Sequence, residues 1–138
     1  LPLLFVLALA SCGGTKKTIM MHRRILGLPP GSDVLVDHRN GDGLDNRRSN
    51  LRPATASQNR ANMGKPRRPD GGQCSSRFKG VSWDRSRHKW QAKIRVDGQH
   101  RSLGRYASEG EAAGAYDRAA IAAWGPFAQT NFPTGEAA

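Results

Sequence analysis

The chain of 138 residues is strongly basic: 22 Lys and Arg stand against 11 Asp and Glu, which gives a net charge of +11. Only 37% of the residues are apolar, and 16 Gly and 8 Pro interrupt the chain, so one large hydrophobic core is excluded in favour of one ordinary domain or two very small ones. Residues 15–69 carry 12 basic and 4 acidic side chains, and residues 77–133 carry 10 and 5. Both parts are therefore positive, which predicts a polyanionic partner, nucleic acid first.

The first ten residues form a continuous apolar run that is too short to cross a bilayer as a helix. With Ser11 and Cys12 after it, the run is typical of a signal-peptide core that ends in a lipoprotein cleavage box, and such a chain would begin at Cys12 after processing. No basic region precedes the run, so a hydrophobic strand or an unstructured end is the alternative, and residues 1–17 are treated as an unassigned N-terminal segment. The two cysteines, Cys12 and Cys74, form no C-x-x-C pair, which excludes a zinc ribbon.

Residues 18–63 contain a set of polar residues placed at the ends of predicted strands and at the start of a predicted helix. A strand over Thr18–Met21 and a short helix over His22–Leu28 lead to the apolar run Val34–Val36, which ends in Asp37 and His38. A polar loop and a second short strand follow, and Asn50 stands between them. Thr55 and Gln58 fit a capping box that opens a helix containing Asn59. We therefore expect a carboxylate, an imidazole and amide oxygens to lie close together.

Two other interpretations of the loop remain beside this one. Asn40–Gly43 resembles part of a calcium-binding EF-hand loop, but that alignment places His38 and Ser49 where acidic ligands are required. The simpler alternative is an Asn- and Gly-rich turn beside a histidine with an ordinary structural role.

The stretch from about Thr18 to Asn62 resembles the HNH, or ββα-metal, nuclease motif of the phage and intron homing endonucleases. The resemblance rests on Asp37-His38, Asn50-Leu51-Arg52 and Asn59, together with Met21-His22-Arg23. It implies that His38 is the general base, that Asn50 fixes the loop, and that Asp37 and Asn59 bind a divalent metal, Mg²⁺ first and Mn²⁺ as the alternative. Histidine has a pKa suited to activating water, and Mg²⁺ accepts a sparse shell of oxygen ligands. His22 either lies beside this site or has a structural role.

Residues 64–76 hold three Gly, two Pro and three basic residues, and this composition predicts a flexible basic linker. Its cations either follow a phosphate backbone or belong to a solvated tether.

Residues 77–133 predict three short strands, Phe78–Trp83, Lys89–Arg95 and Gln99–Tyr106, followed by an alanine-rich helix. The Asp97-Gly98 pair favours a tight hairpin turn, and Ser108 with Glu111 forms a second capping box. Trp90, Ala92 and Ile94 alternate with polar and basic residues, so one face of this sheet is expected to be apolar.

This segment resembles the plant ethylene-response-factor (Apetala-type) DNA-binding domain. The matching residues include Phe78–Val81, Leu103-Gly104, Ala115–Asp117 and Asn131–Pro133. The resemblance implies a three-stranded antiparallel sheet on one helix, with the sheet laid in the major groove. It implies DNA contacts from Lys79, Lys93 and Arg95, and Trp83, Arg85 and Arg101 are expected local substitutes.

The sequence thus predicts an α+β chain in which a small ββα-metal HNH module (18–63) and a linker (64–76) precede a DNA-binding domain (77–133). The expected function is metal-dependent cleavage of double-stranded DNA in the cytoplasm, with no small-molecule substrate and no membrane partner. The alternative is a non-catalytic DNA-binding protein whose nuclease module has decayed.

Overall fold

The computed structural model describes residues 6–8, 18–65 and 74–133, and it confirms the α+β class. Contacts between Cα atoms divide the chain into two compact units, Leu1–Asn59 and Arg60–Ala138. The predicted lipoprotein box at residues 9–12 and the middle of the predicted linker at 66–73 lie outside the described residues.

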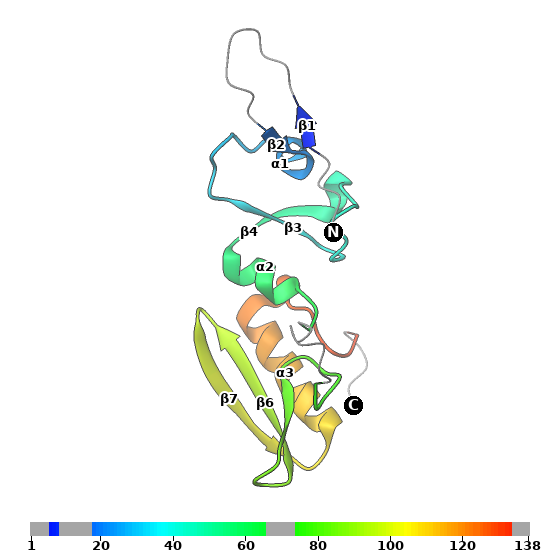
Figure 1. Ribbon diagram of the computed structural model, residues 1–138, viewed down its shortest axis with the longest axis vertical. Helices are drawn as coiled ribbons and strands as arrows, with labels where there is room; N and C mark the ends of the chain where they lie inside the picture. Colours follow the sequence, from blue (N-terminus) through cyan, green and yellow to red (C-terminus); the bar gives the residue numbers. More distant parts are fainter. Residues whose placement is uncertain (1–5, 9–17, 66–73, 134–138) are drawn as a thin grey trace. The chain divides into compact units, whose positions relative to one another are not determined.

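The first unit is built from two small hairpins and two short helices (Figure 1). Strand β1 (Val6–Ala8) pairs antiparallel with β2 (Thr18–Met20), and α1 (Met21–Ile25) follows directly. Strand β3 (Leu35–His38) pairs antiparallel with β4 (Leu51–Ala54), and the 3₁₀ turn η1 (Arg48–Asn50) leads into β4. Helix α2 (Ala56–Asn62) completes the predicted ββα order.

Helix α1 is too short to be stable by itself, and two arginines fix it to the rest of the unit. Arg23 donates to the backbone oxygens of Val34 at 2.8 Å and Ser32 at 2.6 Å, just ahead of β3. Arg48 donates to the oxygen of Ile25 at 2.7 Å. Because the strand and the loop are both tied to α1, the residues of α1 keep a defined place relative to the end of β3.

The predicted capping box at the start of α2 is confirmed. The backbone N–H of Thr55 donates to Gln58 Oε1 at 2.9 Å, and the N–H of Gln58 donates to Thr55 Oγ1 at 3.2 Å. This reciprocal pair satisfies two donors that a helix start would otherwise leave unpaired.

The second unit contains the predicted sheet, in the order β5 (Val81–Asp84), β6 (Lys89–Val96), β7 (Gln99–Tyr106), all antiparallel. The turn between β6 and β7 has positive φ at both Asp97 and Gly98, as a two-residue type I′ turn requires. The register shifts between Ala92 and Lys93, because Ala92 pairs with Gly104 whereas Lys93 pairs with Ser102. Leu103 is thus an extra residue on β7, which is a β-bulge.

Helix α3 (Glu109–Trp124) lies along one face of this sheet (Figure 1). It begins with the predicted capping box of Ser108 and Glu111 and ends at Gly125, where η2 (Gly125–Phe127) starts. Small helix residues allow close packing on the sheet. The buried core comprises Val81, Ala92, Ile94, Ala112, Ala113, Ala115, Tyr116 and Ala120.

The buried carboxylate of Asp117 fastens the C-terminal segment to this core. It accepts the backbone N–H groups of Asn131 at 2.8 Å and Phe132 at 2.9 Å, and the Asn131 side chain at 3.0 Å. The amide of Asn131 in turn bonds both the N–H and the carbonyl of Lys79, at 2.6 and 3.1 Å. The entry to β5 is therefore held against the segment that contains Asn131 and Phe132.

The described ends of the predicted linker are also fixed. The ammonium of Lys65 donates to the carbonyls of Ser76 and Phe78, the latter at 2.9 Å. Ser76 is buried, and its hydroxyl accepts the Phe78 N–H at 3.0 Å. In the described ranges, 6–8, 18–65 and 74–133, no helix is long and apolar enough to span a membrane.

Candidate functional site

The end of β3 places Asp37 in the interior of the first unit. Its side chain is 4% exposed, and its Oδ2 accepts Arg52 Nε at 2.7 Å. Arg52 is the direct cross-strand partner of Asp37 on β4, and its side chain is 7% exposed. A charged pair so far from water stabilises the unit only while both partners are present.

Replacement of Arg52 by Met should therefore destabilise the first unit, by about 3–5 kcal/mol, because the Asp37 carboxylate would stay buried beside a neutral side chain. Arg47→Met is the matched control, since Arg47 pairs with Asp45 on the surface with 78% of its own side chain exposed. Denaturant unfolding followed by circular dichroism measures both variants. Equal midpoints for the two variants would contradict a structural role for the buried pair.

The His38 imidazole is oriented by a residue that the sequence analysis missed. Its Nε2 lies 3.2 Å from Asn46 Oδ1, and the Asn46 amide donates to the carbonyl of Leu44 at 3.4 Å. The second bond places Oδ1 on the histidine side, so Asn46 fixes the orientation of the ring. Asn46 falls eight residues from His38 in a loop rich in Asn and Asp, where sequence spacing offered no way to select it.

His22 lies beside this imidazole, which decides the question that the sequence left open. The two ring centroids are 5.6 Å apart and the ring planes meet at 81°, an edge-to-face contact. Burial lowers the pKa of His22, and the nearby charges of His38 and Arg23 lower it further. His22 is therefore mainly neutral at neutral pH, and it packs against His38 as an uncharged ring.

Asn50 holds the loop between β3 and β4, as the HNH resemblance implies for it. Its buried amide donates to Asn40 Oδ1 at 2.9 Å and to the carbonyl of Asp45 at 2.8 Å, and its Oδ1 accepts the Asn40 N–H at 3.1 Å. Asn40 and Asp42 also accept backbone N–H groups two residues ahead of them, at 2.9 Å each. These bonds are ordinary Asx-turn contacts, which account for the part of the loop that resembled a calcium site.

The residues expected to bind a metal are of a kind that suits Mg²⁺. The donors are the carboxylate of Asp37 on β3 and the amide oxygen of Asn59, whose backbone N–H bonds the carbonyl of Thr55 at 2.9 Å within α2. Neither here nor elsewhere in the described part of the chain could a group of three His, Cys, Asp or Glu residues form a full protein cage for a metal. Two oxygen donors fit a cation that keeps most of its water ligands.

The outer face of the sheet, opposite α3, is basic. Along β6, the buried residues Ala92 and Ile94 alternate with the exposed residues Lys93 and Arg95, as the sequence predicts. Lys93 and Arg95 therefore lie on the outer face. Cross-strand partners point to the same face, so this open face also includes further polar residues. Its remaining members on β6 and β7 are Lys89, Gln91, His100, Ser102 and Arg105.

Arg105 was missed by the sequence analysis, and the structure explains its place. It pairs with Gln91 across the strands, and its Nε donates to Asp84 Oδ2 at 2.9 Å. The hydroxyl of Ser86 and the guanidinium of Arg105 hold the pKa of Asp84 well below its usual range. One carboxylate therefore stands among the cations of the open face.

The other four expected DNA contacts lie elsewhere. Trp83 pairs with Trp90, at 4.9 Å between ring centroids, and Arg101 pairs with Ile94, so both belong to the helix-bearing face. The bulge at Leu103 causes the displacement of Arg101, since an unbroken register would set Arg101 opposite Arg95. Arg85 is exposed in the turn after β5. Lys79 is half-buried, and its ammonium donates to the carbonyls of Ala61 and Met63 at 2.7 and 2.5 Å.

Comparison with known proteins finds relatives for two parts of the chain. Residues 21–61 match the family described as HNH endonuclease. The C-terminal region is similar to plant proteins of Arabidopsis thaliana. The AP2-like ethylene-responsive transcription factor AIL5 is 42% identical over 45% of this chain and 13% of its own length. The dehydration-responsive element-binding protein 2E is 45% identical over 41% of this chain and 27% of its own length.

The chain therefore combines an HNH endonuclease module with an ethylene-response-factor-like domain, as the sequence predicts. It spans less than a third of the length of these curated relatives. No solved structure matches it.

Proposed function

We propose that the protein is a metal-dependent DNA endonuclease of the homing type that hydrolyses phosphodiester bonds in double-stranded DNA. The observation that carries this proposal is the placement of His38: its imidazole contacts Asn46 and His22 at the end of β3, one residue after the acidic Asp37. The match of residues 21–61 to HNH endonucleases supports it. The protein would act where DNA is found, in the cytoplasm of its host cell.

In the proposed reaction, the His38 imidazole takes a proton from the water that attacks the phosphorus atom. Asn46 and His22 keep the imidazole oriented, and Asn50 keeps the loop in place. Asp37 and Asn59 would hold Mg²⁺, or Mn²⁺, which when bound offsets the negative charge on the departing 3′ oxygen. The phosphodiester bond to that oxygen breaks, which leaves a 3′ hydroxyl and a 5′ phosphate.

The open face of the sheet is the proposed surface for duplex DNA. Lys93 and Arg95 are exposed there, and arginine can bind a guanine edge through two hydrogen bonds whereas lysine makes a looser contact. Arg85 in the adjoining turn can extend this contact. Lys79, Trp83 and Arg101 lie away from the open face, so we propose that they contribute less to the contact with DNA.

Replacement of both Lys93 and Arg95 by Ala should weaken binding to duplex DNA by roughly tenfold or more. The slope of log K against log salt should become shallower by about two, because two phosphate contacts are lost. The matched control is Arg118→Ala, because Arg118 is exposed on α3 behind the sheet. Fluorescence anisotropy at several salt concentrations measures both effects. A double variant that binds with the salt slope of the wild type would refute the open face as the DNA surface.

The cleavage chemistry is tested by the ends of the product. Supercoiled plasmid nicked by the wild type in Mg²⁺ is freed of protein and treated with DNA ligase. Nicks that ligase reseals carry a 3′ hydroxyl and a 5′ phosphate, as proposed. Nicks that ligase cannot reseal would contradict the departure of the 3′ oxygen.

The second candidate is a DNA-binding protein that does not cleave. The Asp37–Arg52 pair favours it, because a guanidinium at 2.7 Å already compensates the carboxylate proposed as a metal ligand. This candidate predicts salt-sensitive DNA binding with no cleavage in any divalent metal.

A further inference from the structure

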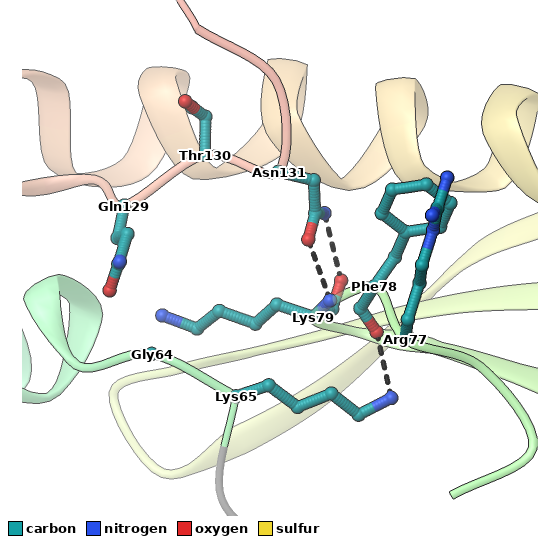
Figure 2. Close-up of a pocket in the computed structure, with 8 residues that line it drawn as sticks. All are labelled: Gly64, Lys65, Arg77, Phe78, Lys79, Gln129, Thr130 and Asn131. Carbon is teal, nitrogen blue, oxygen red and sulfur yellow. Dashed lines mark hydrogen bonds between the residues drawn. The ribbon is translucent and has the colours of Figure 1, made fainter.

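Two arginines of the second unit converge on a single carboxylate, that of Asp84. Arg105 Nε donates to Asp84 Oδ2 at 2.9 Å, and Arg87 Nη1 lies 3.5 Å from the same oxygen. The cations that line a cavity of about 300 Å³ elsewhere in this unit are arranged differently, because the charged ends of its two lysines and its arginine point in different directions (Figure 2). The Asp84 group is therefore a built arrangement of charged side chains, whereas the cavity is not.

The turn after β5 holds the Asp84 carboxylate in one orientation. Its Oδ1 accepts the Ser86 hydroxyl at 2.6 Å, the Ser86 N–H at 3.1 Å and the Arg87 N–H at 3.3 Å. The Ser86 hydroxyl and the Arg105 guanidinium lower the pKa of Asp84, so the carboxylate is ionised at neutral pH. With Oδ1 occupied by the turn, Oδ2 is presented to Arg105.

The side chain of Arg105 lies across the central strand to reach this oxygen. Asp84 is on β5 and Arg105 is on β7, and β6 runs between them. Two strand spacings separate the backbones of the outer strands by about 9.5 Å. Asp84 pairs with Lys89 and Arg105 pairs with Gln91, so both side chains belong to the open face. Arg105 is thus held along the surface proposed for DNA.

The ion pair leaves the outer end of the Arg105 guanidinium available. Nε is used for Asp84, and among the residues that the structure describes the two Nη groups have no hydrogen-bond partner. These groups carry four N–H donors in one plane. The side chain of Arg105 is 35% exposed and that of Asp84 is 12% exposed, so DNA on the open face would meet the guanidinium first.

From this geometry we infer that Arg105 is a specificity-determining residue that reads guanine, and that Asp84 is the positioning residue that orients it. The inference rests on the proposed binding of duplex DNA to the open face and deepens it. Two parallel N–H donors match O6 and N7 of guanine in the major groove. The Asp84 carboxylate repels phosphates, which favours a neutral base edge as the partner. Because Asp84 already orders the side chain, Arg105 loses less conformational freedom on binding.

Selection of duplexes from a randomised pool by the full chain tests the role of Arg105. The wild type should enrich guanine at a defined position, and an A·T pair there should weaken binding by roughly tenfold. Arg105→Lys keeps the charge but lacks the planar fork, so it should lose this preference with the slope of log K against log salt unchanged. Arg118→Lys on α3 is the matched control and should keep the preference.

Asp84→Asn tests the positioning role separately. The Asn amide oxygen can accept the same N–H groups of Ser86 and Arg87, so the turn is preserved. The variant releases Arg105 and removes a negative charge. It should therefore bind unrelated duplexes more tightly than the wild type and discriminate less at the selected guanine, whereas damage to the fold would weaken binding to every duplex.

Enrichment of the same guanine by Arg105→Lys would overturn base reading by Arg105, and full discrimination by Asp84→Asn would overturn the positioning role. A wild type that binds DNA without preference for guanine would overturn the inference and leave the proposed function intact. Absence of DNA binding by the wild type would overturn both.

Discussion

His38→Ala should reduce DNA cleavage by at least about 10²-fold, because the variant lacks the imidazole proposed to accept the proton of the attacking water. Alanine removes the imidazole that Asn46 and His22 orient, and it leaves the backbone pairing of His38 with Leu51 possible. The basic surfaces of the second unit are unchanged, so DNA affinity should stay close to that of the wild type. Single-turnover cleavage at saturating protein separates the chemical step from binding.

The control for this experiment removes a histidine that has no place in the proposed site. His88 lies in the turn after β5 with a positive φ of 50°, a conformation that Asn tolerates well. His88→Asn should therefore cleave at the wild-type rate at saturation. Parallel loss of cleavage and DNA binding in His38→Ala would contradict the role of His38 as the base.

Gly80→Ala should unfold or strongly destabilise the second unit, at a cost of more than about 3 kcal/mol. Gly80 has φ of +76°, and a Cβ there would lie 2.0 Å from Tyr116 Cδ2 and 2.8 Å from the carbonyl oxygen of Lys93. Tyr116 is buried in the core, and the Lys93 oxygen belongs to the central strand. Neither neighbour can move without breaking the packing of α3 on the sheet.

Gly114→Ala is the matched control, since it adds the same methyl group within α3. Its Cβ would meet only Arg118 Nη1, at 3.5 Å, which is an ordinary contact. Alanine in a helix interior is favoured over glycine by roughly 0.5–1 kcal/mol, so this variant should be as stable as the wild type or more so. Thermal unfolding followed by circular dichroism compares the two, and equal melting temperatures would refute the steric argument.

Local rules of sequence predicted much of the fold. Both capping boxes, the Asp97-Gly98 turn and the alternation of Ala92 and Ile94 depend on residues close in the chain, and the structure contains them all. The residue types of the HNH motif likewise selected Asp37 and His38 before any contact was known.

The features that sequence could not predict depend on pairing between distant residues. The bulge at Leu103 moves Arg101 to the helix-bearing face. The pattern of polar and apolar residues along β7 does not predict this bulge. The pairing of β3 with β4 places Arg52 on Asp37 across fifteen positions, and a loop contact selects Asn46 for His38. The roles of the site residues stay a prediction from the HNH resemblance, whereas register and loop geometry determine the partners of these residues.

The most direct test of the nuclease assignment is relaxation of supercoiled plasmid by the purified full chain, in Mg²⁺ or Mn²⁺ and in EDTA. The proposed function predicts nicked plasmid that accumulates with divalent metal, and nicking that stops when EDTA is added while binding to DNA continues. Plasmid that is bound in a salt-sensitive manner but stays supercoiled in both metals would contradict it and would leave the DNA-binding protein without catalysis as the function.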